Sequence, residues 1–352
     1  MGLTKPIEQY LFSNLLTKIH VVVYLKDIIR GVITMKKKIT VEGFEIGTKE
    51  NHQALTGVSV ILAKEGAIAG CCVKGSAPGT RETDLLKSEK TVEQVHSIVL
   101  SGGSAFGLES TCGVMNYLEE MGVGFDVGVA KVPIVCGAVL FDLAVGDPNI
   151  RPDKEMGYLA AKKASTEIFI GNSGAGCGAT VGKLRGFDTM MKGGTGYVEI
   201  CLERGLKVGA YVCVNACGEV YEGETILAGA LNDDKTEIIS SHQLMLEGAE
   251  RDLSGKNTTI GCILTNAKLT KTECNKVAEV AHNGYALSIR PIHTSMDGDT
   301  IFTLASGIAE ANLDTVCYLA QEAMKLSVID AIKSAESVQN IPSYRSTHSI
   351  SE

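Results

Sequence analysis

The stretch SGKNTTIGCILTN, residues 254–266, joins a polar segment directly to an apolar one. Residues with high β-propensity alternate from Ile260 to Leu264, and this period of two predicts a buried strand. Asn257, Thr258 and Thr259 stand immediately before that strand. Such an entry has two interpretations: an ordinary loop that leads into a strand, or a bond at which the chain cuts itself.

Segments on both sides of this stretch have the periodicity of strands or helices. Period-two alternation predicts β segments at 57–75 (a hairpin that turns at Lys64–Gly66), 95–103, 197–218 (a second hairpin) and 299–307. Helical spacing predicts helices at 105–122, 268–289 and 311–335. This order favours an α/β fold in which two antiparallel sheets pack face to face with helices outside, an αββα sandwich.

Composition narrows the classes of partner. The chain has 352 residues and 45% hydrophobic content, which is ample for a large core. Its formal net charge is −8, and Lys36–Lys38 is the one clearly basic block. Nucleic acid is therefore not expected as a partner.

The cysteines indicate a reducing compartment. There are 11 of them, an odd number with irregular spacing, and no Cys-x-x-Cys pair occurs. A disulfide framework and a zinc site are both unexpected from this pattern. We expect reduced, buried thiols in a cytoplasmic protein.

Residues 1–34 differ in character from the rest of the chain. Lys18, Lys26 and Arg30 interrupt their apolar residues, so the uninterrupted runs are too short to span a bilayer. No small-residue cleavage site stands out. We expect an N-terminal extension, either not native or an amphipathic appendage, before a single domain at 35–352 that does not enter a membrane.

Two glycine-rich stretches are similar to known motifs but miss their requirements. In SGGSAFG, residues 101–107, position 106 is Phe where a nucleophile elbow around Ser104 requires Gly. In GNSGAGCGATVGK, residues 171–183, position 177 is Cys where a phosphate loop requires Gly, and Leu184 follows Lys183. The sequence leaves one other interpretation of this stretch open. The loop would carry Lys183 into a site and offer its backbone N–H groups to an oxyanion.

An acidic pair precedes the predicted strand at 299–307. Asp297 and Asp299 flank Gly298 in HTSMDGDT, residues 293–300. Calcium is a weak interpretation because no further acidic ligands follow at loop spacing. The seven histidines include no i, i+4 pair, so no metal is expected, and a hydrolase here would need a base other than His.

Six ordered stretches carry a family resemblance. They are GSAPGTRETDLL (75–86), VLSGGSAFGLES (99–110), VPIVCGAVLFDL (132–143), GNSGAGCGATVGK (171–183), NTTIGCILTNAKLTK (257–271) and RPIHTSMDGDTIF (290–302). Together they resemble the self-processing peptidases of the P1/S58 family, over about residues 40 to 335. That family includes D-aminopeptidase/esterases, β-peptidyl aminopeptidases and nylon-oligomer hydrolases. The resemblance implies an αββα sandwich similar to that of the N-terminal-nucleophile hydrolases.

The resemblance also implies a site. Self-cleavage would fall between Asn257 and Thr258, giving chains 1–257 and 258–352, and Thr258 would be the nucleophile, with Thr259 as its rival. Lys183 matches a site lysine and Asn215 a site asparagine, while Asp297 and Asp299 match residues that orient and activate the nucleophile. Asn-Thr with paired Asp is the pattern of the nylon-oligomer-hydrolase branch. The branch of the D-aminopeptidase/esterases and β-peptidyl aminopeptidases has Gly-Ser at the cleavage site instead. The substrate preferences of that branch are therefore a poor guide to those of this chain.

The chemistry of a terminal threonine explains why this site needs no histidine. A free α-amino group has a pKa of about 7.7–8.0, so it can act as a general base for its own hydroxyl. A positive charge on Lys183 would keep that amine less protonated. Asn215 and a backbone N–H would hold the oxyanion.

These inferences predict an amidohydrolase or aminopeptidase that cleaves small peptides or linear amides through an acyl-enzyme. Two alternatives stay open: an acyltransferase on the same fold, in which an amine captures the acyl group, and a scaffold that processes itself but is inactive. No cofactor is expected. The resemblance implies a homo-oligomer, usually a tetramer.

Overall fold

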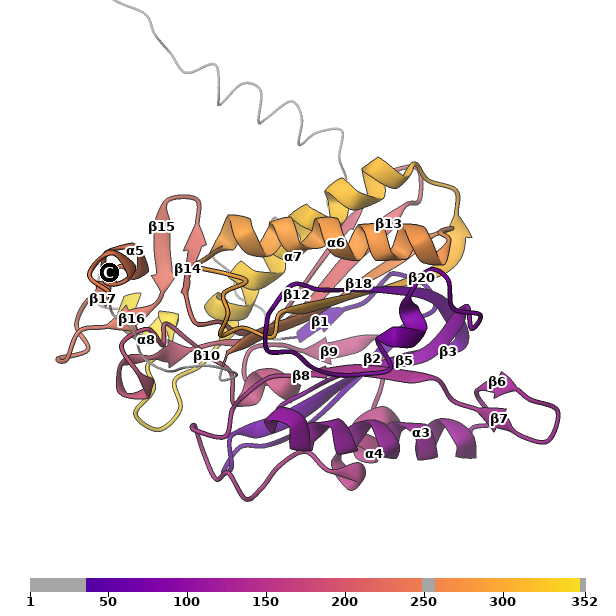
Figure 1. The fold of residues 1–352 in the computed structure, drawn as a ribbon, viewed down its shortest axis with the longest axis horizontal. Helices are drawn as coiled ribbons and strands as arrows, with labels where there is room; N and C mark the ends of the chain where they lie inside the picture. The colour runs from indigo at the N-terminus through magenta and orange to yellow at the C-terminus, as the bar shows by residue number, and fades with distance from the viewer. Residues whose placement is uncertain (1–35, 249–256, 349–352) are drawn as a thin grey trace, which may run out of the picture.

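Two layers of β-strands lie between two pairs of helices (Figure 1). The computed structural model describes residues 36–248 and 257–348. The predicted extension at 1–34 lies outside the described residues. Residues 249–256, just before the proposed cut, also lie outside them.

The first layer contains the strand predicted after Asn257. β18 (Thr258–Ala267) lies between β13 (Lys207–Asn215), which is antiparallel to it, and β20 (Thr300–Ala309), which is parallel. β12 (Gly194–Cys201) pairs with β13 and completes the second predicted hairpin. Its turn needs Gly205 at φ +88°, a conformation that a residue without a Cβ adopts easily.

The second layer is built on β3 (Thr56–Val73). One side of β3 pairs with β2 (Glu45–Asn51) and the other with β5 (Gln94–Ser101). β8 (Val135–Val139) and β4 (Gly79–Arg81) continue the layer beyond β5. The last part of β3 pairs with β20, so this one strand links the two layers.

The hairpin predicted at 57–75 is wrong. Lys64–Gly66 lies within one continuous strand, and the pairing of β3 with β5 shifts register between Leu62 and Ala67. The two halves do not pair with each other because each has other neighbours. Gly66, at φ +80°, marks the irregularity rather than a reversal of the chain.

Four helices cover the outer faces of the two layers. α6 (Lys271–Ser288) and α7 (Leu313–Ser334) pack on the first layer, and α3 (Ser110–Glu120) and α4 (Lys154–Lys162) pack on the second (Figure 1). α6 begins at a capping box in which Thr270 and Glu273 satisfy each other's backbone N–H groups. α4 was not predicted from the sequence.

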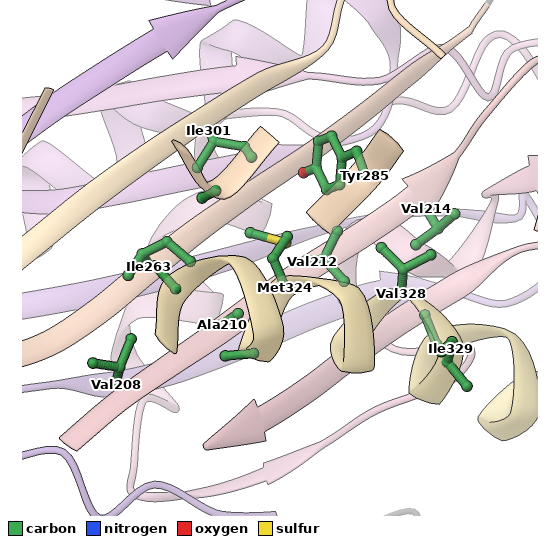
Figure 2. Close-up of a cluster of buried hydrophobic side chains, with 14 of the residues drawn as sticks. Val208, Ala210, Val212, Val214, Ile263, Tyr285, Ile301, Met324, Val328 and Ile329 are labelled. Carbon is green, nitrogen blue, oxygen red and sulfur yellow. The ribbon is translucent and has the colours of Figure 1, made fainter. Parts of the chain in front are cut away.

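Three apolar cores separate these layers. The core between the first layer and α6/α7 includes Val212, Ile263, Tyr285, Met324 and Val328 (Figure 2). The core between the two layers includes Ile61, Ile98, Ile260, Leu264 and Phe302. The core between the second layer and α3/α4 includes Val60, Val99, Val114, Leu118 and Ala161. Three cores in four layers confirm the predicted αββα sandwich. The prediction of two separate antiparallel sheets is wrong, because β3 joins the layers into one nine-stranded sheet in which the β18–β20 and β5–β8 pairs are parallel.

Shorter elements complete the described chain. The small β-pairings join β1 (Lys36–Lys38) to β9 (Glu167–Phe169), β6 (Phe125–Asp126) to β7 (Lys131–Val132), β10 (Thr180–Val181) to β11 (Met191–Lys192), and β16 (Ala230–Leu231) to β17 (Ile238–Ile239). A further three-stranded sheet has the order β15 (Thr225–Ala228), β14 (Glu219–Glu222), β19 (Ile289–Arg290). The short helices are α5 (Ser241–Leu246) and α8 (Tyr344–His348), with 3-10 turns at Asp84–Leu86, Ser104–Glu109, Gly174–Cys177 and Phe187–Thr189.

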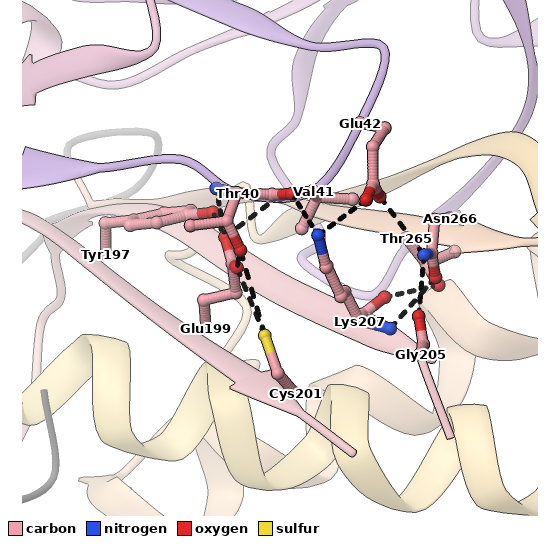
Figure 3. Close-up of polar contacts among 10 residues, drawn as sticks. All are labelled: Thr40, Val41, Glu42, Tyr197, Glu199, Cys201, Gly205, Lys207, Thr265 and Asn266. Carbon is pink, nitrogen blue, oxygen red and sulfur yellow. Dashed lines mark hydrogen bonds and ion pairs between the residues drawn. The ribbon is translucent and has the colours of Figure 1, made fainter. Parts of the chain in front are cut away.

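A polar network ties the start of the described chain to the C-terminal end of β18 (Figure 3). Glu199 accepts the backbone N–H of Thr40 at 2.9 Å, and Lys207 donates to the carbonyl oxygen of Thr40 at 2.7 Å. Glu42 accepts from Lys207 at 2.5 Å and from Asn266 at 3.1 Å. These contacts join three segments that are distant in sequence.

Most of the cysteine side chains lie inside the fold. All eleven cysteines lie in described segments and are free thiols, and eight of them are buried. None of the helices in residues 36–248 and 257–348 has the length and apolar character needed to cross a membrane.

Candidate active site

Thr258 and Asn215 lie directly opposite each other at the edge where β18 begins. Directly paired residues of antiparallel strands project from the same face. That face is the one between the two layers, because Ile260 and Cys213, two positions farther along each strand, belong to the core between the layers. Thr258 is 4% exposed and Asn215 is fully buried, so both side chains are protected from solvent.

Thr259 projects to the opposite face. Two positions farther along, Gly261 lies against the Tyr285 hydroxyl of α6 and the Met324 side chain of α7. The hydroxyl of Thr259 is buried, and it has no hydrogen-bond partner in the described ranges. Its backbone N–H donates to Asp299 Oδ1 at 2.7 Å. The strand therefore presents the two threonines to different surroundings.

The carbonyl oxygen of Asn257 receives two hydrogen bonds. The backbone N–H of Gly298 donates to it at 3.1 Å, and the Thr258 hydroxyl also donates to it. Gly298 lies so close that a Cβ there would approach Thr258 Oγ1 to 2.8 Å and the Ala77 carbonyl oxygen to 2.7 Å. Glycine at 298 thus leaves room for the threonine hydroxyl beside the peptide bond.

Asp297 and Asp299 are both fully buried and follow each other around that glycine. Asp297 Oδ2 accepts from the backbone N–H of Thr294 at 2.8 Å and from the Thr294 hydroxyl at 2.6 Å. Burial and the negative charge of Asp299 raise the pKa of Asp297, and the Thr294 donors and Lys183 oppose this shift. The net effect raises the pKa of Asp297 to about 6.

Lys183 reaches the site from the end of the glycine-rich stretch 171–183, as the sequence allowed. Its Nζ donates to the backbone oxygen of Asn215 at 2.9 Å, to Asn215 Oδ1 at 3.0 Å and to the Ala216 carbonyl at 3.4 Å. Burial lowers the pKa of Lys183 to about 7, and nearby Cys217, Asp297 and Asp299 oppose this shift. Lys183 can therefore change charge near neutral pH.

Asn215 is held by its neighbours. Its Oδ1 accepts from the Thr180 backbone N–H at 2.9 Å as well as from Lys183, and its Nδ2 donates to the Phe141 carbonyl at 2.9 Å. The amide orientation is therefore fixed. The oxyanion role predicted for Asn215 stays a prediction, whereas the N–H that donates to the Asn257 carbonyl belongs to Gly298.

The sequence did not reveal His293. Its Nδ1 lies 2.9 Å from Asp299 Oδ2, and its backbone N–H donates to the same oxygen at 3.2 Å. It sits in the loop before the acidic pair, and its backbone has φ +58°. A search for histidine pairs at helical spacing does not detect a single histidine that binds an aspartate six residues later.

The structure thus brings together Asn257, Thr258, Asn215, Lys183 and the acidic pair. Ser104 opens a 3-10 turn and lies outside this group of residues. No cluster of three or more His, Cys, Asp or Glu side chains suited to a metal occurs in the described ranges. The site contains a hydroxyl, a buried amine, an amide and two carboxyl groups, which suits acyl transfer.

Comparison with protein families identifies the family of this chain. The model of peptidase family S58 matches residues 37–344. The chain belongs to peptidase family S58. As a member of this family it is a hydrolase that acts on peptide or amide bonds.

This S58 peptidase is similar in sequence to two kinds of protein. An uncharacterised aminopeptidase of Mycobacterium leprae is 38% identical over 320 residues, which cover 82% of this chain and 85% of the relative. A 6-aminohexanoate-oligomer endohydrolase of Agromyces is 28% identical over 271 residues, which cover 75% and 73%.

Solved structures confirm the fold. A protein of Pyrococcus horikoshii superposes with a TM-score of 0.65 at 19% identity, covering 89% of this chain and 92% of that chain. The L-aminopeptidase D-Ala-esterase/amidase of Ochrobactrum anthropi, described as a variant of the Ntn hydrolase fold, also gives 0.65, at 18% identity over 86% and 87%. The predicted similarity to N-terminal-nucleophile hydrolases is therefore confirmed for the fold.

Proposed function

We propose that this S58 peptidase cuts itself between Asn257 and Thr258 and that the freed Thr258 is its nucleophile. The observation that carries the proposal is the arrangement at that peptide bond. The Thr258 hydroxyl contacts the Asn257 carbonyl group, and the Gly298 N–H already donates to its oxygen at 3.1 Å. A donor in this position stabilises the negative charge that develops when the carbonyl is attacked.

Self-cleavage would proceed as an N-to-O acyl shift. Thr258 Oγ1 bonds to the Asn257 carbonyl carbon, the C–N bond breaks, and the amine gains a proton while the hydroxyl loses one. Water then opens the ester and leaves a carboxylate on Asn257 and a free amine on Thr258. In this proposal the buried acidic pair beside the bond exchanges the proton.

The mature enzyme would reuse the same groups. The Thr258 amine takes the hydroxyl proton, the hydroxyl attacks a substrate amide, and water hydrolyses the acyl-enzyme. Lys183, held by Asn215 directly opposite Thr258, is the nearby group whose charge influences that amine. We propose small peptides or linear amides as substrates, in line with the relatives called aminopeptidase and oligomer endohydrolase.

Intact mass and N-terminal sequencing of the purified protein test the proposal. We expect fragments of about 27 and about 10 kDa from the 37.2 kDa chain, with the smaller one beginning Thr-Thr-Ile. Thr258→Ala should stay uncut and inactive, whereas the matched variant Thr259→Ala should be cut. A Thr258→Ala protein that is still processed, or that hydrolyses aminoacyl anilides at the wild-type rate, would refute the proposal. The ratio of free acid to new amide formed in the presence of an added amine acceptor would distinguish hydrolysis from acyl transfer.

We further propose a homo-oligomer in the cytoplasm. The β6–β7 hairpin projects from the body of the molecule (Figure 1) and exposes apolar side chains, with Val129 at 96% and Val127 at 49%. Exposed apolar groups on a projecting arm favour contact with a second copy of the chain.

The free thiols favour a reducing compartment.

A further inference from the structure

The two carboxyl groups of the acidic pair have unequal hydrogen-bond environments. Asp299 accepts the backbone N–H groups of Thr259 and His293, one on each oxygen. His293 Nδ1 lies 2.9 Å from the second oxygen and is a third donor in the tautomer that carries the ring proton on Nδ1. Asp297 receives both of its donors from Thr294 on a single oxygen. Its second oxygen, Oδ1, is buried and has no hydrogen-bond partner in residues 36–248 and 257–348.

This asymmetry indicates where the proton of the pair resides. N–H donors stabilise a carboxylate, and a buried carboxyl oxygen without a donor favours the protonated form. Two neighbouring buried carboxyl groups do not both ionise readily, so a charge fixed on one keeps the proton on the other.

We propose that His293 is a positioning residue that keeps the negative charge of the acidic pair on Asp299 and so leaves the proton of the pair on Asp297. The inference rests on the proposed self-cleavage. In the N-to-O shift, the protonated Asp297 gives its proton to the departing amine, and the pair takes back the proton that the Thr258 hydroxyl loses. Bonds and protons then balance without any further reactant.

The packing around His293 fixes its ring against Asp299. The His282 ring of α6 lies at 4.8 Å between centroids, nearly edge to face, and the Tyr285 ring lies at 6.3 Å. His282 donates through Nε2 to the Cys72 carbonyl at 3.0 Å. Only 20% of the His293 side chain is exposed, against 0% for Asp299. A ring that is largely covered and packed against two other rings has little freedom to leave its carboxylate.

No other titratable group that faces the His293 ring takes its place as the side-chain partner of the Asp299 carboxylate in the described ranges. Burial lowers the pKa of His282 to about 4, so that ring stays neutral near neutral pH. Tyr285 is buried, and burial raises its pKa well above the usual range. Lys74 donates its backbone N–H to the Asp299 backbone carbonyl at 3.0 Å, and the described hydrogen bonds of Lys183 Nζ go to Asn215 and Ala216 rather than to Asp299. His293 is therefore the one titratable side chain with a described hydrogen bond to the Asp299 carboxylate.

The test compares His293→Ala with His293→Asn. The amide Nδ2 of Asn stands as many bonds from the backbone as the imidazole Nδ1, and Asn tolerates positive φ, so His293→Asn keeps a donor in place. Each chain is made by brief cell-free synthesis, diluted into buffers from about pH 5 to about pH 9, and followed by intact mass for release of the small chain. Self-cleavage needs no added substrate, so no ligand has to be assumed.

We expect His293→Ala to cut roughly 30-fold to 100-fold more slowly at neutral pH. Its acidic limb should move to higher pH by on the order of one unit, because loss of a donor to a carboxylate raises the pKa of the pair. His293→Asn should recover most of the rate and the wild-type pH profile.

Two results would overturn the inference: a wild-type rate and profile in His293→Ala, or equal loss in both variants with an unmoved profile, which indicates a merely structural role. Melting temperatures of both variants in a Thr258→Ala background show whether each folds. If the wild-type chain itself is never cut, the proposed function fails instead, and the two failures are thereby distinguished.

Discussion

Two adjacent threonines in this protein lie in different chemical environments, because successive side chains of a strand project to opposite faces. Thr258 faces Asn215 and the space between the layers, beside the carbonyl of Asn257. Thr259 faces α6 and α7, and it contributes its backbone N–H to Asp299. Sequence resemblance favoured Thr258 over its neighbour, and the orientation of the strand supports that choice on physical grounds.

The first prediction for a single residue concerns Gly298. A methyl group at 298 would lie 2.8 Å from Thr258 Oγ1, so Gly298→Ala must displace the hydroxyl or the loop. A displacement of about 1 Å in a reacting group can cost about 100-fold in rate. We expect self-cleavage at least about 100-fold slower, measured as the half-life of the uncut chain.

A matched glycine variant separates this effect from general loss of stability. Gly205→Ala lies in an exposed turn at φ +88° with nothing near the added methyl group. It should cost about 1 kcal/mol through backbone strain and leave the rate of cutting unchanged. Equal slowing in both variants would mean that Gly298 acts through stability alone.

The buried lysines lead to a prediction about pH. Burial lowers the pKa of Lys183 to about 7 and that of Lys192 to about 8, from 10.5. Between the folded and unfolded values the unfolded lysine binds a proton that the folded one does not. The free energy of unfolding therefore rises with pH in that window, by up to ~1.4 kcal/mol per pH unit for each lysine.

Lys→Met variants in an uncut Thr258→Ala background isolate this contribution. The free energy of unfolding of the parent minus that of Lys183→Met should begin to rise near pH 7, and for Lys192→Met about one unit higher. The difference cancels the opposing effect of buried thiols such as Cys136 and Cys217, whose pKa values burial raises to about 12. A flat difference for both variants, from denaturant titrations, would show that these amines stay charged in the fold.

Much of the site could be predicted from sequence, but not all of its geometry. Resemblance supplied Thr258, Lys183, Asn215 and the acidic pair, and the structure gathers them at the start of β18. Sequence resemblance could not identify Gly298 as the donor to the Asn257 carbonyl. Every residue except proline has a backbone N–H, so the residue type does not reveal which of them donates. Resemblance also missed His293, since its partner is a carboxylate rather than another histidine.

At the scale of elements, periodicity predicted what depends on local pattern. β18, β20, α6 and α7 lie where alternation and helical spacing placed them. β3 was misjudged because Lys64–Gly66 has the composition of a turn, whereas pairing with two different layers extends the strand through it.

The helix α4 was missed for a related reason. It is short, from Lys154 to Lys162, and Gly157 within it lies against the backbone of Ser110 at the start of α3. Small residues that allow two helices to approach closely do not produce an apolar stripe. Its start at Asp153, whose side chain accepts the Met156 N–H, is the one local signal.

At the scale of the whole molecule, the proposed cut divides the fold through its centre. The segment from Thr258 onward provides β18 and β20 in the middle of the first layer and both helices that cover it. The segment before the cut provides β12 and β13 on one side and β3 on the other. Asn266, after the cut, also binds Glu42, from before it (Figure 3). The two cores on either side of β18 draw on both segments, whereas the core against α3 and α4 lies entirely within the segment before the cut.

This interlocking gives the final prediction. After cutting, the two chains should co-elute in size-exclusion chromatography without denaturant and should unfold in one thermal transition, because separation would expose the cores on both sides of β18. The small chain expressed alone should not fold. Its release on simple dilution, or two separate transitions in calorimetry, would contradict the shared core. A bond can be broken here without loss of the fold because strand pairing on both sides of β18 holds the new terminus opposite Asn215, where the proposed chemistry needs it.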